Sequence, residues 1–175
     1  MVAPGTKAPA LGFDTVAHGV YEIGAEAPPG GTYLFFARGR HCKWTRMAIK
    51  DLDDRIGDFA LRAIRVAAVT SLDREAAAQL KDELQIIRLP IGYGLDVLRT
   101  AADWGLYVTH QSTEPDAPHL HWEPGQFWVT SDGMVGLAAS QSGPNLWADN
   151  TNAIRAIENT GKFPERGRGG PQGKR

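Results

Sequence analysis

The segment "TYLFFARGRHCKWT", residues 32–45, runs from an apolar stretch into the only cysteine of the chain, Cys42. Residues 32–37 are apolar on both alternating faces, which is typical of a strand buried between two layers. A helical pattern begins directly after the cysteine. We therefore expect Cys42 at the junction between a buried strand and the first turn of a helix.

The apolar residues that follow Cys42 form one stripe of helical periodicity. They recur at spacings of three, four and three residues, which predicts a helix reaching to about residue 57. These residues are Ile49, Leu52, Ile56 and Phe59.

Strands and helices alternate along the middle of the chain. A second buried strand is predicted over 63–70, followed by a helix that Ser71 can cap. A loop with one proline and two glycines at 89–95 then leads into a third helix. The apolar stripes of the two helices are Leu72, Ala76, Leu80 and Leu84 in one, and Leu95, Leu98 and Ala102 in the other.

The C-terminal part of the chain predicts a hairpin and a last helix. After a short strand candidate at 106–110, two strand-like runs within 125–140 flank a turn at 131–133. The last helix is expected over about 146–158, with Trp147, Ile154 and Ile157 on its apolar side.

This order predicts an α/β fold with a mixed central sheet and helices on both faces, because alternating strands and helices imply parallel pairing and the hairpin adds antiparallel strands. We divide the chain into an N-terminal arm over 1–30, a main domain over 31–160 and a Gly- and Arg-rich tail over 161–175 whose end we expect to be disordered.

Composition limits the classes of function. The formal net charge of −1 provides no electrostatic case for binding nucleic acid or an anionic membrane. No apolar run approaches the roughly 18 residues that a membrane helix needs, and no signal peptide is visible at the start. A single cysteine cannot form an internal disulfide, so we expect a reducing, cytoplasmic location.

The predicted position of Cys42 favours the thiolate over the thiol. Unpaired N–H groups and the positive end of the helix dipole point at it. Arg38, Arg40, His41 and Lys43 add basic side chains on either side. The alternative is a buried structural cysteine, a common fate of free cysteines. We favour a reactive thiol, because low-pKa thiols occupy electropositive, partly exposed sites.

The segment "FFARGRHCKWT", residues 35–45, resembles the "FYRGxHCPxC" active-site segment of peroxiredoxin-like proteins in the alkyl hydroperoxide reductase and thiol-specific antioxidant family. Four further segments match that family in order: 4–11, 89–109, 122–135 and 162–167. The resemblance implies a thioredoxin-like fold with Cys42 as the redox centre and no cofactor or metal. It also leaves room for a homodimer, because peroxidases with this fold frequently dimerise.

The sequence departs from the family at three positions. Thr45 stands where the family often has a second cysteine, so an oxidised Cys42 must be resolved by an outside thiol. The Thr45 hydroxyl is expected to hydrogen-bond to the sulfur. Conventional peroxiredoxins place proline seven residues, and threonine or serine three residues, before the reactive cysteine; here these positions are Phe35 and Gly39.

Three further residues are assigned to the substrate site. Pro124 precedes the strand "QFWVT", at a place where thioredoxin-fold proteins commonly have a cis-proline that shapes the docking surface for a thiol substrate, so we expect a cis bond near Cys42. Trp44 and Trp122 are expected to flank the thiol as an apolar wall for an organic substrate.

The segment "HLHW" offers a metal-binding alternative. His119 and His121, with Asp116 nearby, are residue types that bind divalent metals. Their spacing fits no known metal-site pattern, so we interpret the segment as a solvated or gate-like loop.

Two hypotheses follow. The first is a one-cysteine thiol oxidoreductase: the Cys42 thiolate attacks a peroxide or a disulfide, Arg38 and Arg40 steady the negative charge, and His41 moves a proton. An external thiol of the glutathione or thioredoxin type then regenerates Cys42. The second is a catalytically degenerate thioredoxin-like binding module, since the second cysteine and the hydroxyl at Gly39 are missing.

Overall fold

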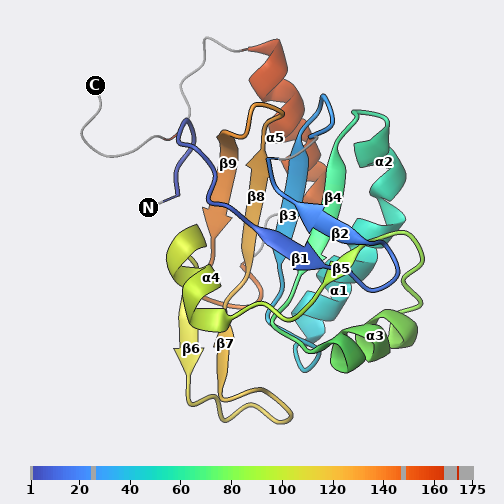
Figure 1. The fold of residues 1–175 in the computed structure, drawn as a ribbon, viewed down its shortest axis with the longest axis vertical. Coiled ribbons are helices and arrows are strands. Elements are labelled where there is room, and N and C mark those ends of the chain that lie inside the picture. Colours follow the sequence, from blue (N-terminus) through green and yellow to red (C-terminus); the bar gives the residue numbers. More distant parts are fainter. Residues whose placement is uncertain (1, 25–26, 147–148, 164–168, 170–175) are drawn as a thin grey trace.

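The computed structural model describes residues 2–24, 27–146, 149–163 and 169. Its centre is a five-stranded mixed sheet with the strand order β5-β4-β3-β8-β9 (Figure 1). Strands β3, β4 and β5 are parallel, and β8 is antiparallel to both of its neighbours, β3 and β9. The strands are β3 (Thr32–Phe36), β4 (Arg65–Val69), β5 (Ile91–Gly92), β8 (Gly125–Val129) and β9 (Val135–Ser140).

Helices pack on both faces of this sheet and enclose two apolar cores. Strand β3 separates the cores, because Tyr33 and Phe35 point into one and Leu34 and Phe36 into the other. The first core takes side chains from four helices: α1 (Lys43–Asp54), α2 (Ile56–Ala60), α3 (Arg74–Glu83) and α5 (Asn150–Lys162). The second lies under α4 (Val97–Trp104). The predicted mixed α/β fold is confirmed.

The N-terminal arm is built into the second core. It contains the hairpin of β1 (Gly12–Asp14) and β2 (Val20–Glu22), and its Leu11 and Phe13 are buried in that core. At the other end, α5 runs to Lys162 and so passes the expected start of the tail at 161. Residues 164–168 and 170–175 of the tail lie outside the described residues. None of the helices within the described ranges is long and apolar enough to span a membrane.

Helix boundaries correct several expectations. Helix α3 is capped by Asp73, whose carboxylate accepts from the Ala76 N–H at 2.7 Å, and not by Ser71. The ionised cap suits the positive end of the helix dipole. Helix α5 begins at Asn150 because Asp149 caps it, so the expected start near 146 is wrong. Trp147 lies outside the described residues.

Helix α4 presents a different face from the one expected. Leu98 and Ala102 are exposed, and Thr100, Ala101 and Trp104 are buried instead. The Trp104 ring packs 5.2 Å from Phe36 and 5.1 Å from Phe127, measured between ring centroids. Burying an indole removes more apolar surface from water than burying a leucine, so Trp104 sets the rotation of this short helix.

A buried carboxylate ties the end of α1 to the segment that enters β5. The Asp53 side chain is buried and accepts from the backbone N–H groups of Arg88 at 2.8 Å and Leu89 at 2.7 Å. Burial alone would raise the pKa of Asp53, but these N–H groups hold it below its ordinary value. The ionised form therefore stabilises the fold above the unfolded pKa of about 3.9, and this contribution is lost as pH falls through the folded pKa.

The substitution Asp53→Asn should lower the free energy of unfolding at pH 7 by about 1–2 kcal/mol, because charge-assisted hydrogen bonds become neutral ones. Urea unfolding followed by circular dichroism measures this. The difference from wild type should shrink as the pH falls below the ordinary range of aspartate. The control is Asp54→Asn on the same helix, whose side chain is 62% exposed. An equal loss in both variants would contradict the assignment.

Candidate functional site

Cys42 lies where the sequence places it, at the start of the first long helix. It is the N-cap residue of α1, with extended backbone, and its carbonyl accepts from the Arg46 N–H at 3.1 Å. No side-chain hydrogen bond caps the helix, so its positive end faces this residue. Cys42 is 4% exposed, which makes it less accessible than the partly exposed thiol that we expected.

The turn between β3 and Cys42 explains why the family hydroxyl is missing at Gly39. Gly39 has a φ of 140°, a conformation that L side chains rarely adopt. A Cβ atom there would also lie 3.3 Å from the His41 Nδ1 atom. A threonine or serine would therefore be strained in this turn, and the site is built around other polar groups.

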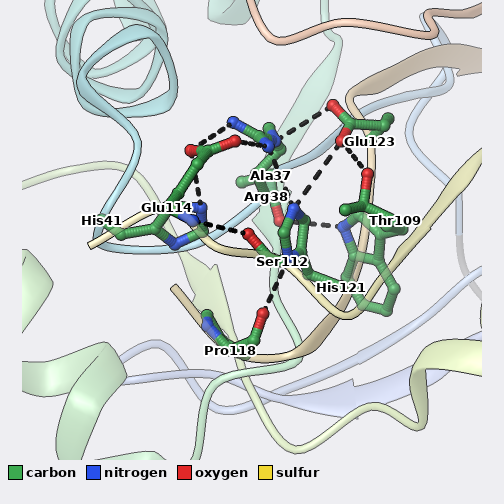
Figure 2. Close-up of polar contacts among 10 residues, drawn as sticks. Ala37, Arg38, His41, Thr109, Ser112, Glu114, Pro118, His121 and Glu123 are labelled. Carbon is green, nitrogen blue, oxygen red and sulfur yellow. Dashed lines mark hydrogen bonds and ion pairs between the residues drawn. The ribbon is translucent and has the colours of Figure 1, made fainter. Parts of the chain in front are cut away.

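The guanidinium of Arg38 is the centre of a buried polar network (Figure 2). The Arg38 side chain is 3% exposed. Its Nη2 and Nη1 atoms donate to Oε1 and Oε2 of Glu114 at 2.6 and 3.2 Å, and its Nε atom lies 3.0 Å from Oε2 of Glu123. Figure 2 shows Arg38 between these two carboxylates. A buried cation needs such partners, because an unpaired charge in the interior is strongly destabilising.

His121 completes the network from strand β7 (Leu120–Trp122). The Arg38 Nη2 atom lies 3.0 Å from Nε2 of His121, and Nδ1 of His121 lies 3.1 Å from the Pro118 carbonyl oxygen. A guanidinium can only donate, so Nε2 accepts and the ring proton lies on Nδ1, where it is donated to Pro118. His121 is therefore a fixed acceptor for Arg38.

The ionisation of this network is set by burial and by mutual pairing. Burial alone would lower the pKa of Arg38, but hydrogen bonding to Glu114, together with the Glu123 charge, raises it. The Arg38 hydrogen bonds hold the pKa of Glu114 below its usual range. Burial would raise the pKa of Glu123, but polar neighbours, among them the Thr109 hydroxyl and Arg38, lower it. Arg38 therefore stays charged and shares its charge with two carboxylates.

The His41 side chain is buried beside this network, and its ring makes no hydrogen bond to the described residues. Its side chain is 1% exposed, its ring centroid lies 5.1 Å from that of His121, and its Nε2 atom is 3.8 Å from Oε2 of Glu114. Neither ring nitrogen has a hydrogen-bond partner among the described residues. Burial lowers the pKa of His41, and the positive charge of Arg38 lowers it further. The ring is therefore neutral at neutral pH.

The other basic residues near Cys42 in sequence point elsewhere, which corrects the expected role of Arg40. Arg40 is 46% exposed and pairs with Glu83 on α3 at 2.8 Å. The Lys43 ammonium lies 5.0 Å from the centroid of the Trp44 ring and Lys43 is exposed. Of the basic residues flanking Cys42, Arg38 is the one that the structure places in the network.

Thr45 and Trp122 also differ from expectation. Thr45 is buried on α1, but its Oγ1 atom makes no hydrogen bond in the described structure, so the expected bond to sulfur is not formed. Trp122 is fully buried in the second core and donates its indole N–H to the Ala37 carbonyl at 2.8 Å. This hydrogen bond stabilises the chain just after β3, and Trp122 does not form the expected apolar wall of a substrate site. Trp44 is half-buried, which leaves its expected role open to test.

The bond before Pro124 is trans, as is every described peptide bond, so the predicted cis-proline is wrong. The backbone continues extended from β7 into β8: the Glu123 N–H donates to the Tyr107 carbonyl, and Gly125 pairs with Phe36. The trans isomer, which X–Pro bonds generally prefer by about 0.5–1 kcal/mol, fits this path. Pro124 does lie at the same end of the sheet as Cys42, but it is buried.

The segment of His119 and His121 is not the solvated loop that was expected. Residues 120–122 form β7, which pairs with β6 (Val108–His110), and His121 is fully buried. His119 and Asp116 are exposed. Within the described ranges, no group of three or more His, Cys, Asp and Glu side chains is arranged to hold a metal ion.

Sequence reasoning missed Glu114 and Glu123. A charged arginine at a strand end signals the need for acidic partners, but the chain contains 20 Asp and Glu residues and no spacing singles out these two. The nearest signal was the position of Glu123 just after the "HLHW" segment and just before the closing hairpin.

Comparison of the structure with solved structures shows a peroxiredoxin-like thioredoxin fold. A yeast mitochondrial 1-Cys peroxiredoxin aligns over 100% of this chain and 84% of its own, with a TM-score of 0.73 and 12% identity. The peroxidoxin BcpB of Mycobacterium tuberculosis aligns over 90% and 97%, with a TM-score of 0.71 and 12% identity. Peroxiredoxin 6 of Arenicola marina, as a cysteine-to-serine mutant, aligns over 100% and 80%, with a TM-score of 0.72 and 14% identity. Neither a protein-family model nor a curated protein sequence matches the chain significantly.

The predicted thioredoxin-like fold is thereby confirmed. At 12–14% identity these alignments establish the fold, and the chemistry of this chain has to be argued from its own residues.

The substitution Glu123→Gln should lower the free energy of unfolding by about 2–3 kcal/mol, because it removes one of two charges that compensate buried Arg38. Chemical denaturation at neutral pH measures the loss. The matched control is Glu22→Gln, on exposed strand β2. If the two variants lose the same free energy of unfolding, Glu123 does not compensate the buried charge of Arg38.

Proposed function

We propose that the protein is a one-cysteine thiol oxidoreductase whose redox centre is Cys42. The observation that carries the proposal is the single cysteine at the start of α1, in a peroxiredoxin-like fold, four residues after buried Arg38 in the same turn. Anionic sulfur and a developing oxyanion are both stabilised by such a fixed positive group. A reducing, cytoplasmic setting remains part of this proposal.

The proposed cycle has two stages. The Cys42 thiolate attacks one peroxide oxygen, the O–O bond breaks, and Cys42 becomes a sulfenic acid while the leaving oxygen takes a proton to give water or an alcohol. An external thiol then condenses with the sulfenic acid, releasing water and leaving a mixed disulfide. A second external thiol frees Cys42 and leaves as the disulfide. With a disulfide as the oxidising substrate, the Cys42 thiolate attacks one of its sulfurs, the S–S bond breaks, the other half leaves as a thiolate, and the cycle continues from the mixed disulfide.

Arg38 and His41 are the residues proposed to assist. Arg38 would stabilise the negative charge on sulfur and on the departing oxygen. His41, buried and uncharged beside the network, would exchange the proton that this chemistry requires. Gly39 supplies no hydroxyl to orient the peroxide, so we expect slower reaction than in conventional peroxiredoxins.

The burial of Cys42 favours a small peroxide over a protein disulfide as the oxidising substrate. At 4% exposure, the residue offers little surface for a bulky partner in this conformation. The reductant is proposed to be an external thiol of the glutathione or thioredoxin type. This agrees with a structural neighbour described as resolving its thiol through glutathione and thioredoxin systems.

The rival hypothesis is a catalytically degenerate binding module. The same burial of Cys42 and the turn at Gly39, whose φ of 140° disfavours a hydroxyl-bearing residue, are the observations that favour it. The two functions differ in whether Cys42 reacts in the folded protein.

Stoichiometric hydrogen peroxide should convert Cys42 to a sulfenic acid that persists, because the chain has no second cysteine to trap it. Intact-protein mass spectrometry should show a gain of one oxygen, and added glutathione should replace it by one glutathionyl group. The variant Cys42→Ser should show neither change. An unmodified Cys42 under both conditions would establish the binding-module hypothesis instead.

Arg38→Lys should slow this oxidation by about 10–100-fold, since lysine keeps the charge but not the planar fork. The matched control is Arg40→Lys, the same chemical change at a side chain that pairs with Glu83. Peroxide-dependent loss of free thiol over time gives both rates, and circular dichroism checks folding. Equal rates in the two variants would remove Arg38 from the mechanism.

A further inference from the structure

The partners of Arg38 differ in how firmly they are held. His121 and Glu123 are buried, with side chains 0% and 6% exposed. Glu114, in contrast, is 49% exposed and belongs to the loop that joins β6 to β7. One edge of the guanidinium therefore faces the interior, and the other faces a surface loop.

The outer edge of Arg38 has the geometry of a carboxylate site. Its two terminal nitrogens bind the two oxygens of Glu114 as parallel hydrogen bonds of 2.6 and 3.2 Å. This planar, two-pronged arrangement suits any carboxylate and is less favourable for a neutral group. The site is thus defined by Arg38, while Glu114 is its occupant in this conformation.

A cleft opens beside the same loop. It has a volume of about 650 Å³, and its lining includes His41, Asp116 and Pro118 together with Arg40 and Arg46. Asp116 and Pro118 follow Glu114 on the loop, and His41 directly precedes Cys42. A small molecule in this cleft is therefore next to both the loop and the residue before the thiol.

We propose that the outer edge of Arg38 is a binding site for the carboxylate of a small reactant of Cys42, and that Glu114 fills this site when the reactant is absent. The proposal rests on the reactive role of Cys42 proposed above. The chemical class is a peroxide or thiol whose carboxylate lies a few bonds from its reacting atom, because Arg38 and Cys42 lie four residues apart in the turn that joins β3 to α1.

Glu114 competes with the reactant as a tethered ligand. Its effective concentration is high because the loop holds it in place, so the reactant has to displace it. Removing the Glu114 charge should favour carboxylate reagents specifically, while a neutral reagent of the same size gains only from easier access.

The test compares iodoacetate with iodoacetamide, which differ by a carboxylate in place of an amide. In each case the Cys42 thiolate forms a C–S bond and iodide leaves. We expect Glu114→Gln to raise the ratio of the iodoacetate rate to the iodoacetamide rate at least about tenfold, equivalent to about 1.4 kcal/mol. Added acetate should slow the iodoacetate reaction of this variant more than chloride at equal ionic strength.

The matched control is Asp103→Asn, which removes one negative charge from a side chain that is also 49% exposed but lies on α4, outside the Arg38 network and the cleft lining. Its rate ratio should stay at the wild-type value. An unchanged ratio in Glu114→Gln, an equal rise in Asp103→Asn, or no alkylation of folded Glu114→Gln would each overturn the proposal. Because alkylation needs no peroxide turnover, a failure of the oxidoreductase function remains distinguishable from a failure of this site.

Discussion

The burial of one positive charge is the constraint on which this site depends. Arg38 follows β3 in the turn that leads into α1, and its side chain is 3% exposed. Such a charge is tolerated in the interior when carboxylates pair with it and hydrogen bonds replace its hydration. Glu123 and His121 come from the segment before β8, and Glu114 comes from the preceding loop. The turn after β3, the β6–β7 pair and the start of the closing hairpin are therefore held together around one guanidinium.

The same pairing limits what Arg38 can do for Cys42. A free guanidinium beside a helix N-terminus would give the sulfur a full positive neighbour, but here two carboxylates share that charge. The electropositive field is thus weaker than a sequence with four basic residues around one cysteine suggests. Displacing the exposed carboxylate of Glu114 would return part of that charge to the site, which links access to the thiol with its electrostatic environment.

Sequence patterns predicted the architecture because it depends on periodicity and burial. The apolar run of β3 and the stripe formed by Ile49, Leu52 and Phe59 placed Cys42 at the strand-to-helix junction. Boundaries set by capping were less predictable, as Asp73 and Asp149 show.

The site itself was only partly predictable. Arg38 and His41 are close to Cys42 in sequence, whereas Glu114 and Glu123 are brought to them by the pairing of β6 with β7 and β3 with β8. Arg40 is also close to Cys42 in sequence, but its exposed side chain pairs with Glu83 on α3 and does not join the site.

The most direct test is a crystal structure of the protein after treatment with one equivalent of hydrogen peroxide. If Arg38 stabilises the oxygen chemistry at Cys42, electron density for a single oxygen on Sγ should appear within hydrogen-bond distance of the Arg38 guanidinium, about 2.7–3.2 Å. An unmodified Cys42, or an oxygen directed away from Arg38, would contradict the account.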